Sequence, residues 1–173
     1  MKKTTLLKRY ILAPEILVMP GAHDVLSARI IEKTGFLAFF VGGYSATAAL
    51  LGKPDISLLT LSEMVGHAQR LSEAVEIPFL VDADTGYGGV LNVVRTVREM
   101  ERAGAAGLFI EDQVFPKRCG HMDGKQVVAK EDMIAKIKAA LDARSDPDFI
   151  IMARTDALAV SGIQEAIERG NLY

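Results

Sequence analysis

Short, almost wholly apolar segments alternate with longer amphipathic segments along the chain, and this alternation constrains the fold more than any other feature. The apolar segments have the length of buried strands and cover residues 15–21, 36–43, 77–84, 106–113 and 148–157. The segments expected to be helical cover residues 2–13, 24–35, 60–75, 90–104, 130–144 and 163–173. Strands without polar alternation are buried on both faces, so the pattern predicts a parallel sheet covered by helices.

Two parallel architectures fit this order of elements. A doubly wound sheet is the alternative, but no GxGxxG motif follows the first strand. Residues with chemical functions end each strand from the second onward, which is typical of (β/α)8 barrels. The sequence therefore predicts a single domain over residues 1–173 that holds about the first five β/α units of a TIM-type barrel. A complete barrel takes about 250 residues, so we expect a part of a longer chain, or partners that complete it.

Composition narrows the classes of function. The net charge is −2, which lacks the basic excess of a nucleic-acid-binding protein. Cys119 is the single cysteine, so an internal disulfide is excluded and a reducing compartment is indicated. Lys8 and Arg9 interrupt the N-terminal segment before a signal-peptide core forms, and no apolar run reaches the roughly 20 residues of a membrane span. These features predict a cytoplasmic protein.

The segment DADTGYG, residues 82–88, ends the third apolar strand with two carboxylates. In an extended strand, residues two apart face the same side, so Asp82 and Asp84 are expected to point together. Two neighbouring carboxylates stay ionised together only if a cation lies between them. Mg²⁺ suits such a pair because it takes oxygen ligands and keeps several waters. The alternative is that Asp84 caps a turn and Asp82 is solvated.

Three further charged residues are candidates for the site. Glu111 ends an apolar strand, where a carboxylate costs free energy unless it is paired or linked to a metal. We expect it to orient the metal ligands, with a carboxylate at a helix start as the alternative. Asp55 is a candidate for a further acid near the metal, and the alternative is that its segment GKPD is a simple turn. Arg154 suits a carboxylate or phosphate, or else forms an ion pair with the acids.

The loop over residues 114–126 contains the segment PKRCGH. Cys119 lies among Lys117, Arg118 and His121, and these basic neighbours are expected to lower the pKa of its thiol toward neutrality. Such a thiol can give or take a proton. The alternative is a loop cysteine without a role.

The segment VGGYS, residues 41–45, offers unshielded backbone N–H groups that suit an anion, or it forms a simple turn. The chain thus combines a divalent metal, groups that bind anions and one proton donor. This set suits a reaction through an enolate, in which the metal chelates a 2-oxo or 2-hydroxy acid and the thiol protonates the carbanion left by a broken C–C bond. His23 and His67 are expected in or beside helices without a role.

Three longer segments resemble one known superfamily. VDADTGYG, GLFIEDQVFPKRCGHMDGK and DPDFIIMARTDALAVSG are similar to segments of the isocitrate lyase / phosphoenolpyruvate mutase superfamily, and the resemblance runs from residue 10 or so to the end. The motif KRCGH resembles the lyase branch, because the mutases that rearrange phosphonates usually lack that cysteine. The chain looks most similar to the methylisocitrate lyase and 2,3-dimethylmalate lyase group. Proteins labelled carboxyvinyl-carboxyphosphonate phosphorylmutase share GYxxxAxLLGKPD and DQVFPKRCGHM.

The resemblance implies a barrel enzyme that depends on Mg²⁺, or on Mn²⁺, and that is usually a homotetramer. By matching motif positions, the implied metal ligands and their supports are Asp82, Asp84, Asp55 and Glu111. The implied contacts to the substrate are Gly42, Gly43, Tyr44, Cys119, Gly120 and Arg154. The implied catalytic residues are the general acid Cys119 with Lys117, His121 and Arg118, in a gating loop over residues 114–126.

The chain differs from methylisocitrate lyases in one segment. Where methylisocitrate lyases read close to YLSGGG, this chain reads FVGGYS. Phe40 replaces a tyrosine and Gly42 a serine, so no base is assigned and an alkylmalate fits at least as well as methylisocitrate. The predicted function is a Mg-dependent C–C bond lyase that cleaves a 2-hydroxy di- or tricarboxylate into a 2-oxo acid and a carboxylate. The alternatives are a phosphonomutase, an oxaloacetate hydrolase or decarboxylase, and an inactive half-barrel that binds metal and diacid.

Overall fold

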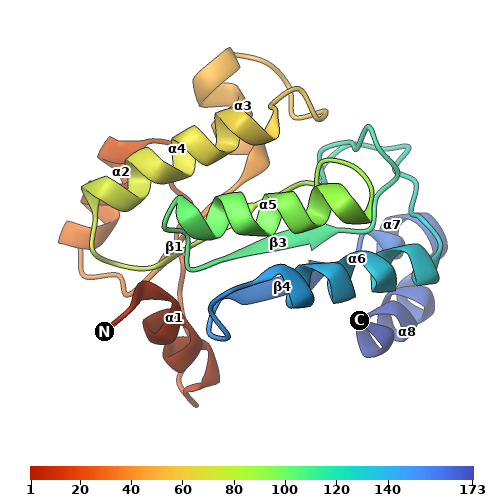
Figure 1. The fold of residues 1–173 in the computed structure, drawn as a ribbon. Coiled ribbons are helices and arrows are strands. Elements are labelled where there is room, and N and C mark those ends of the chain that lie inside the picture. The colour runs from red at the N-terminus through yellow and green to blue at the C-terminus, as the bar shows by residue number, and fades with distance from the viewer.

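The computed structural model describes the whole chain, residues 1–173. Its elements in chain order are α1 Lys3–Leu12, α2 Val25–Lys33, β1 Phe39–Val41, α3 Gly43–Leu51, α4 Leu61–Ala74, β2 Phe79–Asp82, α5 Val90–Arg102, β3 Gly107–Glu111, α6 Lys130–Ala143, β4 Ile150–Arg154, α7 Ala157–Ser161 and α8 Ile163–Leu172. The four strands form one parallel sheet. Helices α5 and α6 lie side by side across one face of it (Figure 1).

The strands follow one another in the sheet in the same order as in the chain, β1-β2-β3-β4. A doubly wound sheet reverses this order at a switch point, whereas a (β/α) barrel does not. The register sets Phe39 against Phe79 and Leu80 against Gly107. The sheet is therefore an open segment of a barrel, as the sequence predicts.

The strand predicted over residues 15–21 is wrong. This segment forms only one parallel bridge, between Gly21 and Phe40. The N–H of Phe40 donates to the carbonyl of Pro20 at 3.0 Å, and the N–H of Ala22 donates to the carbonyl of Phe40 at 2.9 Å. Pro14 and Pro20 bracket the segment and offer no N–H to a strand ladder. The chain therefore has four strands, with an irregular segment beside β1, in place of five β/α units.

The turn considered for VGGYS is also absent, because a helix begins there. Strand β1 ends at Val41 and α3 begins at Gly43. The run SATAALL that follows is rich in alanine and leucine, which favour a helix. The segment therefore joins a strand end directly to a helix N-terminus, where the first N–H groups have no partner within the helix.

Two apolar clusters fix the sheet. The larger lies between the helices and one face of the strands and includes Phe39 and Phe79, whose stacked rings lie 5.0 Å apart. The smaller lies on the opposite face, where Leu80 packs with Leu7 of α1. Successive strand residues point to opposite faces, and each large buried side chain stabilises the fold by about 1.5–3 kcal/mol. Both faces of the strands are thereby held in place.

Helix α1 covers the amino ends of the strands. The Lys3 ammonium donates to the carbonyls of Ser72 and Val75 at 2.8 and 2.7 Å. The Thr5 hydroxyl donates to Asp148, just before β4, at 2.7 Å. One end of the sheet is therefore closed by the chain itself, and the carboxyl ends of the strands remain for a site.

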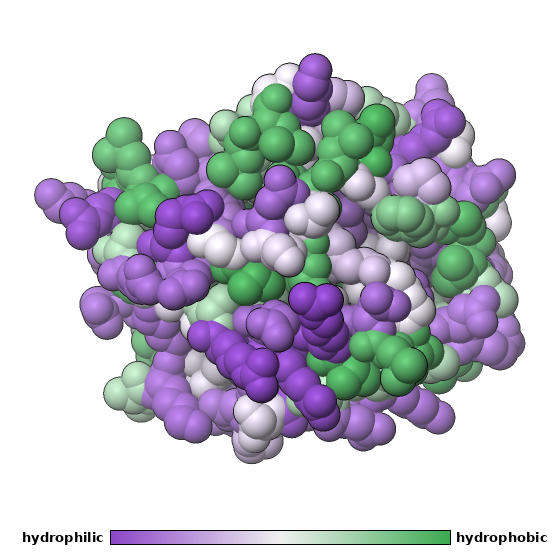
Figure 2. Space-filling view, turned by 45° about the horizontal axis from the view of Figure 1, so that its top comes forward, coloured by the Kyte–Doolittle hydropathy of each residue, from purple (hydrophilic) through white to green (hydrophobic).

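Large apolar side chains are also present on the surface. Figure 2 shows them on one face in several separate patches divided by hydrophilic side chains. On α7 and α8 the exposed ones are Leu158, Val160, Ile163, Ile167 and Leu172. No helix has the length and apolar composition that crossing a membrane requires.

Candidate active site

Charged side chains from consecutive strands meet at the carboxyl edge of the sheet. Asp82 is the last residue of β2, Glu111 of β3 and Arg154 of β4. Parallel strands place their carboxyl ends at one edge, and the register pairs Glu111 directly with Arg154. The fold therefore brings together residues that the sequence assigned to a metal and to a substrate.

Asp82 is almost fully buried and held by two backbone N–H groups. Its Oδ2 accepts from Gly43 at 2.9 Å and its Oδ1 accepts from Asp84 at 2.8 Å. A methyl group on Gly43 would lie 2.9 Å from Oδ2, so only glycine allows α3 to begin this close to the carboxylate. Burial raises the pKa of Asp82. The N–H of Gly43, expected to bind a substrate, is already engaged by this carboxylate.

The side chain of Asp84 lies beside that of Asp82, but for a reason different from the one predicted. Strand β2 ends at Asp82, and Asp84 has a left-handed backbone with φ of +50°. The prediction that strand alternation aligns the two residues is therefore wrong. Their side chains nevertheless line one small cavity together with Asp55, Thr47 and Tyr87. Burial raises the pKa of Asp84 to about 6.

The cation among these carboxylates is the ammonium group of Lys117. Its Nζ lies 2.7 Å from Asp55 Oδ2 and 3.0 Å from Asp84 Oδ1, and its side chain is 2% exposed. Burial opposes the charge, but the surrounding carboxylates outweigh it and raise the pKa of Lys117. The sequence assigned Lys117 to the cysteine. The structure directs it to the acids instead, and no three His, Cys, Asp or Glu side chains converge as ligands for an ion.

Glu111 is buried without a hydrogen bond. Its side chain is 1% exposed, and neither carboxylate oxygen has a hydrogen-bond donor. Arg154 Nη1 approaches Oε2 at 3.2 Å, without the alignment of a hydrogen bond. Burial raises the pKa of Glu111 to about 8. Arg154 also contacts Asp156 at 3.1 Å, so the ion-pair interpretation of Arg154 describes this structure.

The thiol loop faces the same edge. Cys119 is buried, and its Sγ lies 3.5 Å from Nδ1 of His121. The ring of His121 meets the ring of Tyr44 edge-on at 6.4 Å. These three residues line a cavity of about 340 Å³ with Pro54, Asp55 and Met122. Asp55 borders both this cavity and the small carboxylate cavity, so the thiol and the acids lie on two cavities that share this residue as a wall.

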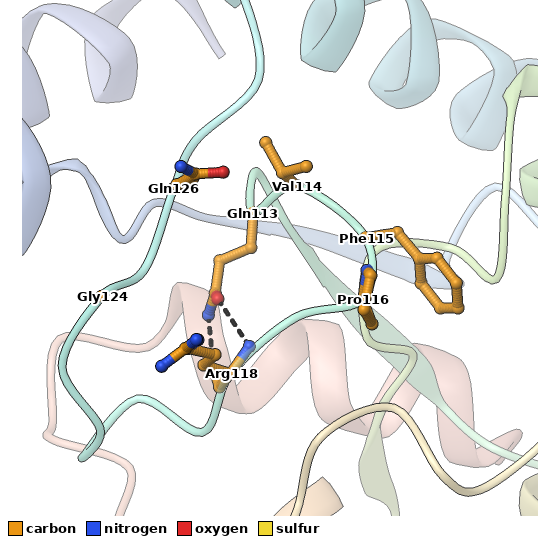
Figure 3. Close-up of a pocket in the computed structure, with 7 residues that line it drawn as sticks. All are labelled: Gln113, Val114, Phe115, Pro116, Arg118, Gly124 and Gln126. Carbon is orange, nitrogen blue, oxygen red and sulfur yellow. Dashed lines mark hydrogen bonds between the residues drawn. The ribbon is translucent and has the colours of Figure 1, made fainter.

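Arg118 does not line the cavity of the thiol. Its guanidinium donates to the carbonyl of Asp123 at 3.1 Å and lies against Gly124. It lines a separate cavity with Gln113 and Gln126 (Figure 3). The side chain adjacent to Cys119 in sequence therefore points to other partners.

Gly120 packs against Arg154. A methyl group at Gly120 would lie 2.7 Å from Arg154 Nη2. The loop therefore approaches the guanidinium closely at this residue, which brings the thiol segment next to the end of β4.

Gly42 precedes α3, and its carbonyl accepts from the N–H of Ala46 at 3.0 Å.

Three residues that support the site were not predicted from the sequence. Asp112 and Gln113 follow β3, and Asp156 follows β4; all three are buried and hydrogen-bonded. The only signal for Asp112 and Gln113 was the run EDQ, a polar stretch after an apolar strand. That run did not show which of its members faces the site.

The fold and site define an (α/β) barrel segment with acids, an arginine and a thiol at the carboxyl ends of its strands. The chain belongs to the phosphoenolpyruvate phosphomutase family, whose model matches residues 7–173. It is 54% identical to 2,3-dimethylmalate lyase of Eubacterium barkeri over 159 residues, which are 92% of this chain and 55% of the relative. It is 52% identical over 162 residues to the chloroplastic carboxyvinyl-carboxyphosphonate phosphorylmutase of Arabidopsis thaliana, covering 91% of this chain and 48% of the relative.

Solved structures agree with this membership. A structure of oxaloacetate acetylhydrolase in complex with the inhibitor 3,3-difluorooxalacetate matches with a TM-score of 0.94 and 38% identity, over 99% of this chain and 59% of that one. Phosphonopyruvate hydrolase in complex with oxalate and Mg²⁺ matches with a TM-score of 0.92 and 34% identity, over 100% and 59%. The chain thus spans about half the length of the curated relatives that it matches.

Proposed function

We propose that this chain carries part of the active site of a C–C bond lyase. Its substrate is a 2-hydroxy di- or tricarboxylate of the alkylmalate or methylisocitrate type, which it cleaves into a 2-oxo acid and a carboxylate. The observation that supports this most is that Cys119 lines a cavity together with Asp55, which also lines the neighbouring cavity of Asp82 and Asp84. The 54% identity to 2,3-dimethylmalate lyase supports the alkylmalate class.

The proposed reaction is a retro-Claisen cleavage. A base removes the proton of the 2-hydroxyl group, the bond between C2 and C3 breaks, and its electron pair leaves on C3 as the enolate of the carboxylate product. The Cys119 thiol then donates its proton to C3. His121, 3.5 Å from the thiol, is placed to return a proton to it. Arg154 holds a substrate carboxylate through two parallel hydrogen bonds.

We also propose that the site binds Mg²⁺, or Mn²⁺. The buried oxygens of Glu111 without donors fit such a cation, because oxygen is the ligand that Mg²⁺ prefers. One or two of the acids Asp82, Asp84, Asp55 and Glu111 would bind the ion directly and the others would support it through water, because Mg²⁺ keeps several waters and substrate oxygens. When bound, the ion stabilises negative charge on substrate oxygens.

A phosphonomutase is the second candidate, favoured by the 52% identity to carboxyvinyl-carboxyphosphonate phosphorylmutase. An oxaloacetate hydrolase is the third, favoured by the TM-score of 0.94 to oxaloacetate acetylhydrolase. The thiol favours the lyase, because C–C cleavage needs a proton donor for the nascent enolate. A half-barrel that binds metal and diacid without turnover is the alternative outside enzymes.

The test is a Mg²⁺-dependent assay of the complete natural protein that contains this sequence. The assay traps the released 2-oxo acid with phenylhydrazine and compares 2,3-dimethylmalate, methylisocitrate, oxaloacetate and a phosphonate. Cys119→Ser is expected to lower kcat with the best substrate on the order of 10²–10⁴-fold, with Mg²⁺ binding unchanged. Equal turnover in wild type and Cys119→Ser would contradict the role of the thiol.

We further propose a cytoplasmic homotetramer whose only small-molecule partner is the carboxylic acid substrate, with no nucleic-acid or membrane partner. The exposed large apolar side chains of α7 and α8 are the surface feature that supports self-association. The net charge of −2 supports the absence of a nucleic-acid partner. Light scattering that gives the mass of a monomer would contradict the tetramer.

A further inference from the structure

Gln113 makes an unusual contact with the loop that carries the thiol. Its side chain is almost fully buried. The Nε2 group donates to the carbonyl of Arg118 at 2.9 Å, and the Oε1 atom accepts from the N–H of the same residue at 2.9 Å. Figure 3 shows both bonds side by side. One side-chain amide thus satisfies both backbone groups of the residue directly before Cys119.

The same amide also reaches the end of β4. Its Nε2 donates to Oδ2 of Asp156 at 3.1 Å, and Asp156 accepts from Nη2 of Arg154 at 3.1 Å. The N–H of Asp156 donates to buried Asp112 at 3.0 Å. Gln113 therefore connects the thiol loop with the strand end that carries the guanidinium, and each of its polar hydrogen-bonding groups has a partner.

The chemistry of this contact requires an amide. Holding both the N–H and the C=O of one residue takes a donor and an acceptor on the same planar group, which the amides of Asn and Gln provide at any pH and an ionised carboxylate does not. A carboxylate keeps the acceptor, loses the donor and places a second negative charge beside Asp156. A buried carbonyl or N–H left without a partner destabilises the state in which it is buried.

The rest of the loop is held less firmly. Residues 120–124 are exposed, and the loop backbone bonds to the body of the domain through Lys117, whose N–H donates to Ser57 Oγ at 3.1 Å. The N–H of Val114 donates to the carbonyl of Gln126 at 2.9 Å, which closes the base of the loop on itself. Loops with few buried contacts open more easily than core elements. The two buried anchors of this loop, the Lys117 ammonium between Asp55 and Asp84 and the Gln113 amide next to Cys119, therefore have a large share in where the thiol lies.

We propose that Gln113 is a positioning residue that holds Cys119 at the site through the backbone of Arg118. Its consequence for turnover rests on the proposed function, in which Cys119 is the general acid. Its consequence for the position of the thiol does not, because the buried thiol and the two hydrogen bonds are features of the fold.

Alkylation of Cys119 by iodoacetamide tests the clamp directly. Cys119 is the only cysteine within residues 1–173, and mass spectrometry of the peptide that contains it gives the rate of alkylation at this one loop under native conditions. Gln113→Ala is expected to raise the rate at least about tenfold, and Gln113→Glu is expected to raise it as well. Gln126→Ala is the matched control, because Gln126 lines the same cavity but is exposed, and it should alkylate at the wild-type rate.

Circular dichroism at the assay temperature separates an opened loop from an unfolded chain. If Gln113→Ala does not fold, Gln113→Glu provides the measurement, since it keeps the size of the side chain. A folded Gln113 variant that alkylates at the wild-type rate would overturn the clamp.

Turnover in the complete protein then distinguishes the two proposals. Faster alkylation together with a lower kcat and a nearly unchanged KM supports both the clamp and the acid role of Cys119. Faster alkylation with turnover unchanged in both Gln113→Ala and Cys119→Ser supports the clamp and contradicts the proposed function.

Discussion

Glu111 and Asp112 are consecutive acids at the end of β3, and both are almost completely buried, at 1% and 0% exposed. Asp112 accepts four hydrogen bonds. Its donors are the Thr155 hydroxyl at 2.7 Å, the Asp156 N–H at 3.0 Å, the Arg169 guanidinium at 3.0 Å and the Tyr173 hydroxyl at 2.9 Å. Glu111 accepts none.

The two side chains have different neighbours. Asp112, directly after β3, contacts Arg169 of α8, while Glu111, the last residue of β3, lies beside Arg154 at the carboxyl edge. A buried carboxylate with four donors stabilises the fold that supplies them. A buried carboxylate without donors costs free energy in this state and is retained where a ligand or an ion supplies the missing partner. Satisfaction of hydrogen bonds thus separates a structural acid from a functional one more clearly than burial does.

The largest effect is expected from removing the charge of Asp112. Asp112→Asn leaves Arg169 buried beside a neutral group that carries donors of its own. Breaking a buried charged pair costs about 3–5 kcal/mol, so the free energy of unfolding should fall by about that much. Urea unfolding followed by circular dichroism measures it, and a loss below about 1 kcal/mol would contradict a structural role for this network.

The same change at Glu111 is expected to have little effect on stability. Glu111→Gln removes a carboxyl group that forms no hydrogen bond, and the free energy of unfolding in EDTA should change by less than about 1 kcal/mol. Mg²⁺ with oxalate is expected to raise the Tm of the wild type, because binding to the folded state stabilises it, and to leave the Tm of Glu111→Gln unchanged. Equal losses of stability in Glu111→Gln and Asp112→Asn would remove the distinction between the two acids.

The smallest effect on stability is expected for His67. This buried residue lies on α4, outside the site, and its Nε2 atom has no hydrogen-bond partner. Burial lowers the pKa of His67 most, and the charge of Arg70 lowers it further. The charge of Asp24 acts in the opposite direction and is outweighed. The unfolded chain therefore takes up a proton near pH 6.5 while the folded chain does not, so stability falls as the pH drops below about 6.5.

One such proton changes stability by at most about 1.4 kcal/mol per pH unit. In His67→Leu the decrease in unfolding free energy between about pH 7 and about pH 5.5 should be smaller than in the wild type. His23→Leu, which replaces an exposed histidine nearby, is the control and should keep the wild-type slope. An unchanged slope in His67→Leu would show that this unpartnered group carries no pH dependence.

Much of the fold could be predicted because its signals are local. Apolar segments 77–84 and 106–113 each contain the strand that the structure shows, and the capping box from Thr60 to Glu63 opens α4 as expected. The apolar composition of residues 15–21 did not distinguish this irregular segment from a strand. Two prolines, which have no N–H, keep it from forming the hydrogen bonds of a strand ladder. Helix α3 was not predicted because it begins at two glycines, Gly42 and Gly43, which are typical of turns.

The order of apolar strands and helices determined by itself that this chain forms a parallel sheet, and that its acids, arginine and thiol end at one edge. Only the tertiary structure decided which of them are partners. Lys117 pairs with Asp55, 62 residues away, and not with the adjacent cysteine, and Gln113 holds the thiol loop instead of facing the solvent. Periodicity fixes the side of a strand on which a residue lies, because that geometry is local. The partner of a buried polar group depends on which distant segment packs against it.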